Sequence, residues 1–546
     1  MKKIFFFLLI AIISIIGCKS QKKEIIKPKL VVGIVIDQMR YDYLTRYADR
    51  YGEDGFNRLL KNGFSLKNAH YNFIPTYTAV GHASIFTGTT PSNHGIISNN
   101  WYDKFLKKSI YCVDDSNYKT VGNSGNYGQK SPHRLYTTTV ADQLNLAQNQ
   151  RGKTIGISIK DRSAILPIGH SANAAYWYDG DDYNTWITST FYMNELPKWV
   201  KDFNANNKAD EYLNEPWKTL YDIKTYTNSL VDDSIFEGKI TGQEKPIFPK
   251  YLKNLRSKND NYSLIKEVPA GNTFTADFAK AAIIGENLGK SNFIDFLTVS
   301  FSSTDYIGHK YGVAAIETED TYLRLDKDLA SFFQFLDTQV GKDNYTLFLT
   351  ADHAAVHVPA YLQSLKIPAH YINTKKLNNF ISGITKKYFN SVELIENISN
   401  YQIFLDKEKI ESLGLNKNDV ADKLAEEVLN FETIYKAVTA KTLQNTNFTS
   451  GVLNSLQNGY NQKFSGDVLM IPYPSTLARG RKGTSHGSGY SYDTHVPLIF
   501  YGNGIKQGSS SKKYEITDIA PTISNLLQIE FPNGTTGKVI DEVYKD

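Results

Sequence analysis

Residues 30–37 read LVVGIVID, a continuous apolar run rich in β-branched side chains that ends at Asp37. A strand that is buried on both faces, as in a parallel sheet covered by helices, has such an unbroken apolar sequence, whereas a half-exposed strand alternates apolar and polar residues. The stretch therefore predicts a central strand of a parallel sheet with a carboxylate at its carboxyl end.

Two later runs have the same character and also lead to polar residues. NFIDFLTVS at 292–300 is followed by Asp305, and YTLFLTA at 345–351 is followed by Asp352 and His353. Open α/β sheets build their sites just beyond the carboxyl ends of their strands. We therefore expect these side chains and Asp37 to meet at one edge of the sheet.

Helical patterns alternate with these strands. Residues 43–63 and 317–340 have helical spacing, HVPLIFYG at 495–502 is a further apolar strand, and 516–527 predicts a closing helix capped by Thr517 or Asp518. The alternation predicts an α/β fold with a central, mostly parallel sheet and helices on both faces.

Two long stretches lack this alternation. Residues near 170–285 and 360–480 are rich in polar and aromatic residues, and we interpret both as inserted cap segments that cover or border the ligand edge of the sheet. The predicted organisation is a signal peptide at 1–18, a polar spacer at 19–29 and one catalytic domain at 30–546 that contains both insertions.

The first residues predict export. Two lysines precede an apolar run at 4–17 that suits a signal peptide and is short for a membrane-spanning helix. The run ends in IIGC, which resembles the cleavage site of bacterial lipoproteins and would make Cys18 the acylated first residue; a plain secreted protein with a chance cysteine is the alternative. We expect a periplasmic protein, anchored in the outer membrane if it is lipidated. Cys112 is the only other cysteine, so a lipidated chain would have no disulfide.

The overall composition is that of a folded globular protein of 546 residues. Its net charge of +5 arises from 61 basic and 56 acidic residues without a long basic run. This balance argues against a nucleic-acid partner.

Six side chains near the predicted strand ends and in the Gly-rich loop GTSHGSG could bind metal: Asp37, Asp305, His309, Asp352, His353 and His486. Oxygen and nitrogen donors without thiolate suit Zn²⁺, with Mn²⁺ or another divalent ion as alternatives, and six ligands exceed one open catalytic site. Taken singly, each aspartate could equally cap a helix and each histidine could be a hydrogen-bonded structural group.

The stretch PTYTAVGHAS at 75–84 has three serine or threonine hydroxyls around one predicted helix start. One of them could be a helix cap, which needs only neighbouring amides, or a nucleophile, which needs help in losing its proton. The stretch alone leaves both interpretations open.

Five motifs in order along nearly the whole mature chain resemble the alkaline phosphatase superfamily: VVGIVIDQMRYDYL, PTYTAVGHASIFTGTTPSNHGI, STDYIGHKYG, TADHAAV and GTSHGSG. Within it, the sequence is most similar to bacterial phosphate-irrepressible alkaline phosphatases of the PafA type. The resemblance implies two zinc ions and no third metal site for magnesium. It implies that Thr78 is the nucleophile and touches the second zinc. The implied ligands are Asp305, His309 and His486 for the first zinc, and Asp37, Asp352 and His353 for the second.

The same resemblance implies how the phosphoryl group is bound. Lys160 and Arg162 in GISIKDRSAILPIGH match a K-x-R feature whose cations bind that group, and in an extended segment two such side chains point the same way. Asn99 matches an asparagine that donates to a nonbridging oxygen. A helix start at Thr78 would also offer free amides to the phosphoryl oxygens, beginning with Ala79.

We therefore predict a monomeric alkaline phosphatase that acts on small-molecule phosphate monoesters through a phosphothreonine and releases inorganic phosphate. The two cations favour the dianionic monoester over a diester. A phosphodiesterase or nucleotide pyrophosphatase with the same metals is the main alternative. A non-catalytic phosphate- or zinc-binding lipoprotein and a metal-dependent phosphomutase are further alternatives.

Overall fold

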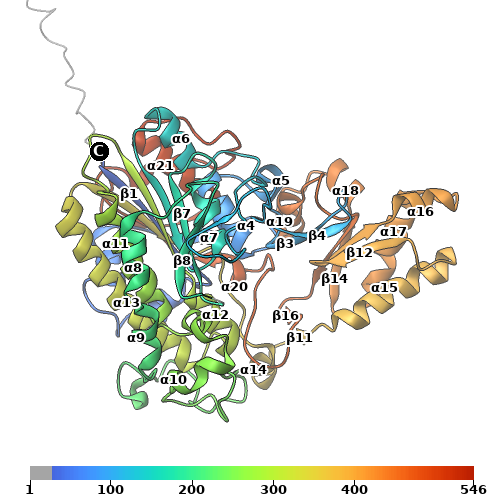
Figure 1. The fold of residues 1–546 in the computed structure, drawn as a ribbon. Coiled ribbons are helices and arrows are strands. Elements are labelled where there is room, and N and C mark those ends of the chain that lie inside the picture. The colour runs from blue at the N-terminus through green and yellow to red at the C-terminus, as the bar shows by residue number, and fades with distance from the viewer. Residues whose placement is uncertain (1–26, 182, 546) are drawn as a thin grey trace, which may run out of the picture.

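The computed structural model describes residues 27–545 except 182. An eleven-stranded sheet runs through its larger part (Figure 1). The fully buried strand β1 (Leu30–Ile36) lies inside this sheet and pairs in parallel with β9 (Asp295–Phe301) and β10 (Tyr345–Thr350). The prediction of a central parallel strand is confirmed.

The parallel part of the sheet continues from β9 to β6 (Thr154–Ser158) and β7 (Ala174–Asp179). Antiparallel strands form both ends of the sheet: β8 (Thr185–Ser189) and β5 (Thr120–Val121) beyond β7, and β18 (Leu498–Gly502), β2 (Phe64–His70) and β17 (His495–Val496) beyond β10. A last strand, β19 (Gly508–Glu515), pairs in parallel with β2. The carboxyl ends of β6, β9, β1 and β10 therefore share one edge.

Helices cover both faces of this sheet (Figure 1). The longest helices of one face are α11 (Ala270–Gly285) and α13 (Ile316–Leu336), which pack on each other. The other face is covered by α4 (Thr78–Thr87), α6 (Val140–Ala147), α7 (Asp161–Ile165) and α21 (Ile519–Leu527).

Some predicted helices differ in their bounds. The continuous helix expected at 43–63 is two short ones, α2 (Tyr43–Arg46) and α3 (Phe56–Asn62). The chain turns between them because the carboxylate of Asp326 on α13 accepts hydrogen bonds from the amides of Gly52 and Phe56, at 2.7 and 2.8 Å. The closing helix α21 has Asp518 as its N-terminal flanking residue, after a turn of 3₁₀ helix at Ile516–Asp518.

The first predicted insertion, near 170–285, begins and ends in the central fold, since β7, β8 and α11 belong to the sheet and its covering layer. Between β8 and α11 lie the short helices α8 (Lys198–Ala205), α9 (Lys208–Asn214) and α10 (Leu252–Leu255). Of these, α8 and α9 pack on α11, and α9 and α10 lie below the sheet in Figure 1. The inserted part of this segment is thus shorter than its sequence suggested.

The second predicted insertion, near 360–480, folds around a separate antiparallel sheet, coloured orange in Figure 1. Its strands lie in the order β12 (Ile395–Ser399), β13 (Gln402–Leu405), β15 (Val468–Pro472) and β14 (Ile434–Thr439). This sheet and the helices α15 (Thr374–Phe389), α16 (Lys407–Ser412) and α17 (Lys417–Glu427) enclose an apolar core of their own. We call this unit the cap domain.

The remaining helices are short and lie in connections: α5 (Pro91–His94), α12 (Ser303–Tyr311), α14 (Pro359–Ser364), α18 (Ala440–Asn445), α19 (Gly451–Gly459) and α20 (Ser491–Thr494). The remaining short strands are β3 (Asn100–Asp103) paired with β4 (Lys108–Tyr111), and β11 (His370–Tyr371) paired with β16 (Thr476–Leu477). Over the described residues, none of the helices combines the length and apolar character needed to cross a membrane. Cys112 is buried and unpaired, whereas Cys18 lies outside the described residues.

Candidate active site

The predicted metal ligands meet at the carboxyl edge of the parallel strands. Asp37 follows β1 directly, Asp352 and His353 follow β10, and α12 after β9 carries Asp305 and His309 one turn apart. The loop before α20 brings His486 to the same place, with its Nε2 3.7 Å from the Asp305 carboxylate. Residues from four separate parts of the sequence thus form one cluster, which we call the ligand cluster.

The donor atoms of this cluster form two overlapping groups. Asp37, Asp352 and His353 have ligand atoms within 4.8 Å of one another, and so have Asp305, His353 and His486. His309 approaches the second group through its Nε2, 3.1 Å from Asp305 Oδ1. All six predicted ligands are therefore in one place, and His353 stands between the two groups.

Backbone carbonyls orient the three imidazoles. The Nδ1 atoms of His309, His353 and His486 lie 2.8, 3.1 and 2.7 Å from the carbonyl oxygens of Thr484, Ala354 and Thr76, respectively. A carbonyl can only accept, so these contacts require a proton on each Nδ1, and a neutral imidazole with that proton keeps a free electron pair on Nε2. That electron pair faces the cluster, as metal-binding histidines require.

The carboxylates of the cluster are buried and incompletely satisfied. Asp37 and Asp352 are fully buried, and Asp37 Oδ1 and Asp352 Oδ2 have no hydrogen-bond partner. Burial and the neighbouring charge of Asp352 raise the pKa of Asp37 well above its ordinary value. Buried carboxylates without partners cost free energy unless a cation compensates them. The residues present therefore fit a pair of divalent metal ions.

Asp305, His353 and His486 are in the protonation states that metal binding needs. Burial opposes ionisation of Asp305, but the neighbouring His309 and Lys160 outweigh it and hold the pKa of Asp305 well below its usual range. Burial also lowers the pKa values of His353 and His486, the latter strongly, which keeps both imidazoles neutral. Metal ligation requires ionised carboxylates and neutral imidazoles.

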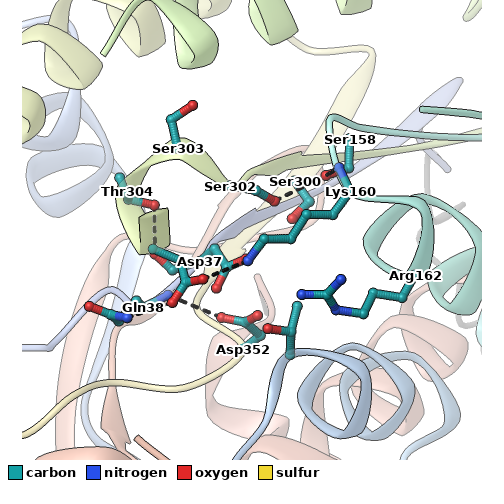
Figure 2. Close-up of polar contacts among 12 residues, drawn as sticks. Asp37, Gln38, Ser158, Lys160, Arg162, Ser300, Ser302, Ser303, Thr304 and Asp352 are labelled. Atoms are coloured by element: carbon teal, nitrogen blue, oxygen red, sulfur yellow. Dashed lines mark hydrogen bonds and ion pairs between the residues drawn. The ribbon is translucent and has the colours of Figure 1, made fainter. Parts of the chain in front are cut away.

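The ammonium group of Lys160 contacts one carboxylate from each of the two groups. Its Nζ donates to Asp37 Oδ2 at 2.7 Å and to Asp305 Oδ2 at 2.6 Å, and Figure 2 shows the side chain reaching Asp37. The side chain is 2% exposed. Burial opposes its charge, yet Asp305 and Asp37 raise its pKa above the ordinary value, so Lys160 is a permanent cation here.

Arg162 lies in a helix, where an extended segment had been expected. Lys160 is the N-terminal flanking residue of α7, and Arg162 is the second residue of that helix. In Figure 2 the Arg162 guanidinium points towards the carboxylates that Lys160 approaches. Its NH1 donates to the Tyr111 hydroxyl at 3.0 Å, and its buried Nε has no partner. The two cations converge because a helix begins between them.

Thr78 begins α4 and is 1% exposed. Its Oγ1 lies 3.5 Å from Nε2 of His353, so the hydroxyl borders the group formed by His353, Asp37 and Asp352. Thr76 instead donates its hydroxyl to the carbonyl of Ser488, and Ser84 pairs with His94 at 2.9 Å. Of the three hydroxyls in this stretch, the one of Thr78 faces the cluster.

Asn99 holds the beginning of α4. Its Oδ1 accepts a hydrogen bond from the Ala79 amide at 2.9 Å. The expectation that the Ala79 amide is free for a phosphoryl oxygen is therefore wrong. The same bond fixes the orientation of the Asn99 amide, whose NH₂ group remains available as a donor.

Two further residues, Gln38 and His82, support the site. Gln38, directly after Asp37, donates its backbone amide to Asp352 Oδ1 at 3.2 Å and its side-chain amide to Asp305 Oδ1. His82, one turn after Thr78, places Nδ1 2.8 Å from the Thr78 carbonyl and Nε2 2.9 Å from the Ser300 hydroxyl. Position beside a ligand, or one turn from a nucleophile, is the only sequence signal for such roles.

Comparison with known proteins identifies the family. The type I phosphodiesterase/nucleotide pyrophosphatase family matches residues 31–496. Alkaline phosphatase PafA from Elizabethkingia meningoseptica is 45% identical over 95% of this chain and 94% of its own. The chain belongs to the PafA-type alkaline phosphatases. The resemblance found in its motifs is confirmed, and this phosphatase is a phosphoric monoester hydrolase.

Other relatives of the phosphatase are equally similar. Alkaline phosphatase PhoV from Synechococcus elongatus is 44% identical over 98% of both chains, and a protein of Myroides odoratus named calcium-transporting ATPase is 45% identical over 96% of this chain and 95% of its own. The crystal structure of wild-type PafA superposes with a TM-score of 0.91 at 44% identity, covering 95% of this phosphatase and 99% of that chain. A second PafA structure, with the same TM-score, has one threonine, one asparagine, one lysine and one arginine replaced, in that order along its chain.

Proposed function

We propose that this phosphatase binds two zinc ions and hydrolyses phosphate monoesters through a phosphothreonine on Thr78, releasing inorganic phosphate. The observation that carries the proposal is the buried ligand cluster beside the Thr78 hydroxyl. The PafA variant replaced at Thr, Asn, Lys and Arg supports the choice of residues, because Thr78, Asn99, Lys160 and Arg162 have the same types in the same order.

Asp305, His309 and His486 would hold one zinc ion, and Asp37, Asp352 and His353 the other. Bound zinc would supply Lewis acidity, which favours ionisation of the Thr78 hydroxyl and neutralises charge on the phosphoryl and leaving oxygens. The carbonyls at the Nδ1 atoms of the histidines hold the imidazoles in the ligating tautomer. Gln38 orients the carboxylates of Asp352 and Asp305 through its two amides.

In the first half of the reaction, Thr78 Oγ1 forms a bond to phosphorus while the bond to the leaving oxygen breaks. His82 fixes the backbone of Thr78 from one turn away, so the hydroxyl is held in place before the substrate arrives. In the second half, water attacks phosphorus, the bond to Oγ1 breaks and phosphate leaves. The overall change is hydrolysis of one ester bond.

Lys160, Arg162 and Asn99 would bind the transferred phosphoryl group. Phosphoryl transfer depends mainly on positioning and on stabilising charge at the nonbridging oxygens. A monoester dianion carries one more negative charge there than a diester, so two cations on this group favour the monoester. The Tyr111 hydroxyl, which also bonds to Asp161, positions the Arg162 guanidinium.

The decisive experiment compares wild-type zinc-loaded enzyme with Thr78→Ala on an aryl phosphate monoester and the matched diester. We expect wild-type kcat/KM to favour the monoester strongly. We expect Thr78→Ala to lose nearly all activity on both esters, because the hydroxyls of Thr76 and Ser84 bond elsewhere. Rapid acid quenching with a labelled monoester should show phosphate bound to Thr78 in the wild type.

Three outcomes separate the alternatives. A preference for the diester would establish the phosphodiesterase function and contradict the roles of Lys160 and Arg162. Full activity of Thr78→Ala would exclude the covalent mechanism. Removal of metal by a chelator should abolish turnover and zinc should restore it; phosphate binding without turnover in the zinc-loaded protein would instead indicate a binding lipoprotein.

We also propose that the enzyme is exported, lipidated on Cys18 and monomeric. The signal-like run and the IIGC sequence support the first two points. Growing cells with an alkyne analogue of palmitate should label the wild-type protein and leave it in the membrane fraction. Cys18→Ser should lose the label and become soluble in the periplasm; unchanged labelling would contradict lipidation.

A further inference from the structure

A cavity of about 350 Å³ lies between the ligand cluster and the cap domain. On the catalytic side it is lined by Tyr77, which precedes Thr78, and by His486. On the opposite side the cap domain contributes Tyr401 and Met470. One cavity therefore reaches from the residues of the reaction to the inserted domain.

The cavity lies where the leaving group of the substrate would be bound. This step rests on the proposed function. Thr78 borders the group of Asp37, Asp352 and His353, so in an in-line displacement the leaving oxygen departs towards the other proposed zinc site, at Asp305, His309 and His486. The imidazole of His486 faces Asp305, and its loop lines the cavity. A leaving group that extends away from phosphorus on this side therefore enters the cavity.

The cavity walls favour an uncharged, aromatic occupant. Several tyrosines line the cavity, among them Tyr77, Tyr401, Tyr473 and Tyr490, and no lysine, arginine or glutamate of the part of the chain that the structure describes does so. The one acidic residue in the lining, Asp493, is 1% exposed and accepts hydrogen bonds from Ser488. Without a cation, such walls offer nothing to a second phosphate, whereas tyrosine rings stack on flat aromatic groups.

Tyr401 adopts a backbone conformation that tyrosine rarely takes. It forms the two-residue turn between β12 and β13 with Asn400, and both have positive φ, 57° and 51°. Such hairpin turns favour asparagine followed by glycine, because a side chain at positive φ crowds the backbone. Asn400 follows this preference and Tyr401 does not, so the turn by itself does not explain the tyrosine. Backbone outliers of this kind often mark functional positions.

The tip of this hairpin is attached to the catalytic part of the chain. The side-chain amide of Asn400 donates to the Asn100 carbonyl at 2.7 Å. Asn100 follows Asn99, which in turn binds the start of the Thr78 helix. The position of Tyr401 is thus coupled by two hydrogen bonds to the position of the nucleophile.

We propose that the cavity between Tyr77 and Tyr401 is a leaving-group subsite for neutral aromatic groups, and that Tyr401 determines specificity for aryl over small alkyl phosphates. The cap domain then takes part in substrate selection, while the chemistry stays at the ligand cluster.

The test compares 1-naphthyl phosphate, which fills the cavity, with methyl phosphate, which leaves it empty. In zinc-loaded Tyr401→Gly we expect kcat/KM for the naphthyl ester to fall about fivefold to tenfold, the range of one aromatic stacking contact. We expect kcat/KM for methyl phosphate and competitive inhibition by inorganic phosphate to stay unchanged. Tyr401→Phe should keep the wild-type ratio because the ring remains.

A second measurement does not depend on turnover. Calorimetry with zinc-loaded Thr78→Ala should show that adding Tyr401→Gly weakens 1-naphthylphosphonate about fivefold to tenfold and leaves methylphosphonate unchanged. Tyr401→Asn serves the same purpose if the glycine variant does not fold, since asparagine also tolerates positive φ. Asn390→Gly, at another positive φ of 53° in the cap domain, is the control for the backbone change and should alter neither ligand.

Equal losses on both esters, or no loss on either, would overturn the subsite. Weaker binding of both phosphonates would overturn it as well, because it would mean that the site as a whole is disturbed. Failure of the proposed function has a different signature: Thr78→Ala would hydrolyse both esters like the wild type, whatever residue occupies position 401.

Discussion

Single side chains of the site are fixed by atoms that are distant in the sequence. A backbone carbonyl fixes the tautomer of each cluster histidine. For His486 this is the carbonyl of Thr76. Lys160 contacts one carboxylate from each half of the cluster. Residue types could be read from the motifs, but which atom of each side chain faces the cluster depends on these long-range contacts.

Lys160→Met should reduce the preference for monoesters. Losing one charge-assisted hydrogen bond to the phosphoryl group should lower kcat/KM for an aryl monoester about 10- to 100-fold. The matched diester, with less charge on its nonbridging oxygens, should lose less. Steady-state kinetics on both esters measures the ratio.

Lys153→Met provides the control for this substitution. Lys153 lies at the opposite end of β6 and pairs with Glu286 at 2.7 Å, away from the cluster. It should leave both rates within about twofold, since partly exposed ion pairs contribute little. Equal losses of kcat/KM for the monoester and the diester in Lys160→Met would contradict the proposal that Lys160 favours the more highly charged ester.

At the scale of elements, α4 joins the proposed nucleophile Thr78 to the predicted metal ligands. All ten of its residues are buried. A Cβ atom on Gly81 would lie 2.1 Å from the backbone carbonyl oxygen of Asp352. The helix that presents Thr78 thus packs directly on the backbone of a predicted ligand, and only glycine permits this approach.

Gly81→Ala should therefore disturb the site and the fold together. We expect a loss of about 1–3 kcal/mol in unfolding free energy from overpacking, together with lower zinc content after dialysis. Urea denaturation and metal analysis give the two quantities.

Gly383→Ala is the matched helix control. A Cβ at Gly383, in α15 of the cap domain, meets no atom within 4 Å. This variant should gain about 0.5–1 kcal/mol and keep its zinc, because alanine is the better helix former. If both variants behaved alike, packing on Asp352 would not be the cause.

At the scale of the whole molecule, the described residues contain two large apolar cores and two small ones. The two large cores lie in different parts of the chain. One surrounds the central sheet and the other belongs to the cap domain. The tip of the β12–β13 hairpin connects the cap domain to the catalytic part through Asn100. The larger core surrounds the central sheet, and the proposed substrate contacts come from both parts.

The central fold contains a carboxylate that should make stability depend on pH. Asp328 on α13 accepts a hydrogen bond from Thr273 on α11 at 3.0 Å, and burial raises its pKa from 3.8 to about 7. The folded protein keeps this proton to a higher pH than the unfolded chain does. The protonated Asp328 carboxyl group therefore makes its full contribution to the unfolding free energy below pH 3.8. This contribution is lost as pH rises through about 7.

Asp328→Asn should remove this pH dependence. The variant should have a higher melting temperature than wild type above pH 7, and the difference should shrink as pH falls towards 4. Thermal denaturation across this range measures the effect. The exposed Asp202→Asn is the control and should follow the wild type; a variant that is less stable than wild type at pH 8 would contradict the assignment.

By itself the sequence determined the fold class, the family and the residue types of the site. Short apolar runs rich in β-branched residues, such as 30–36, indicate buried strands, and the motifs around Asp37, Thr78 and His486 appear in the order of the family. These features are local, because burial and motif spacing are written in neighbouring residues.

Only the tertiary structure decided how these residues act together. It placed Arg162 in a helix, gave the Ala79 amide to Asn99 and set Lys160 between two carboxylates. It also folded 360–480 into a separate domain whose Tyr401 reaches the cavity beside Thr78. These contacts join residues that can be hundreds of positions apart in the sequence. They depend on packing and hydrogen bonds between elements, so a local sequence pattern does not predict them.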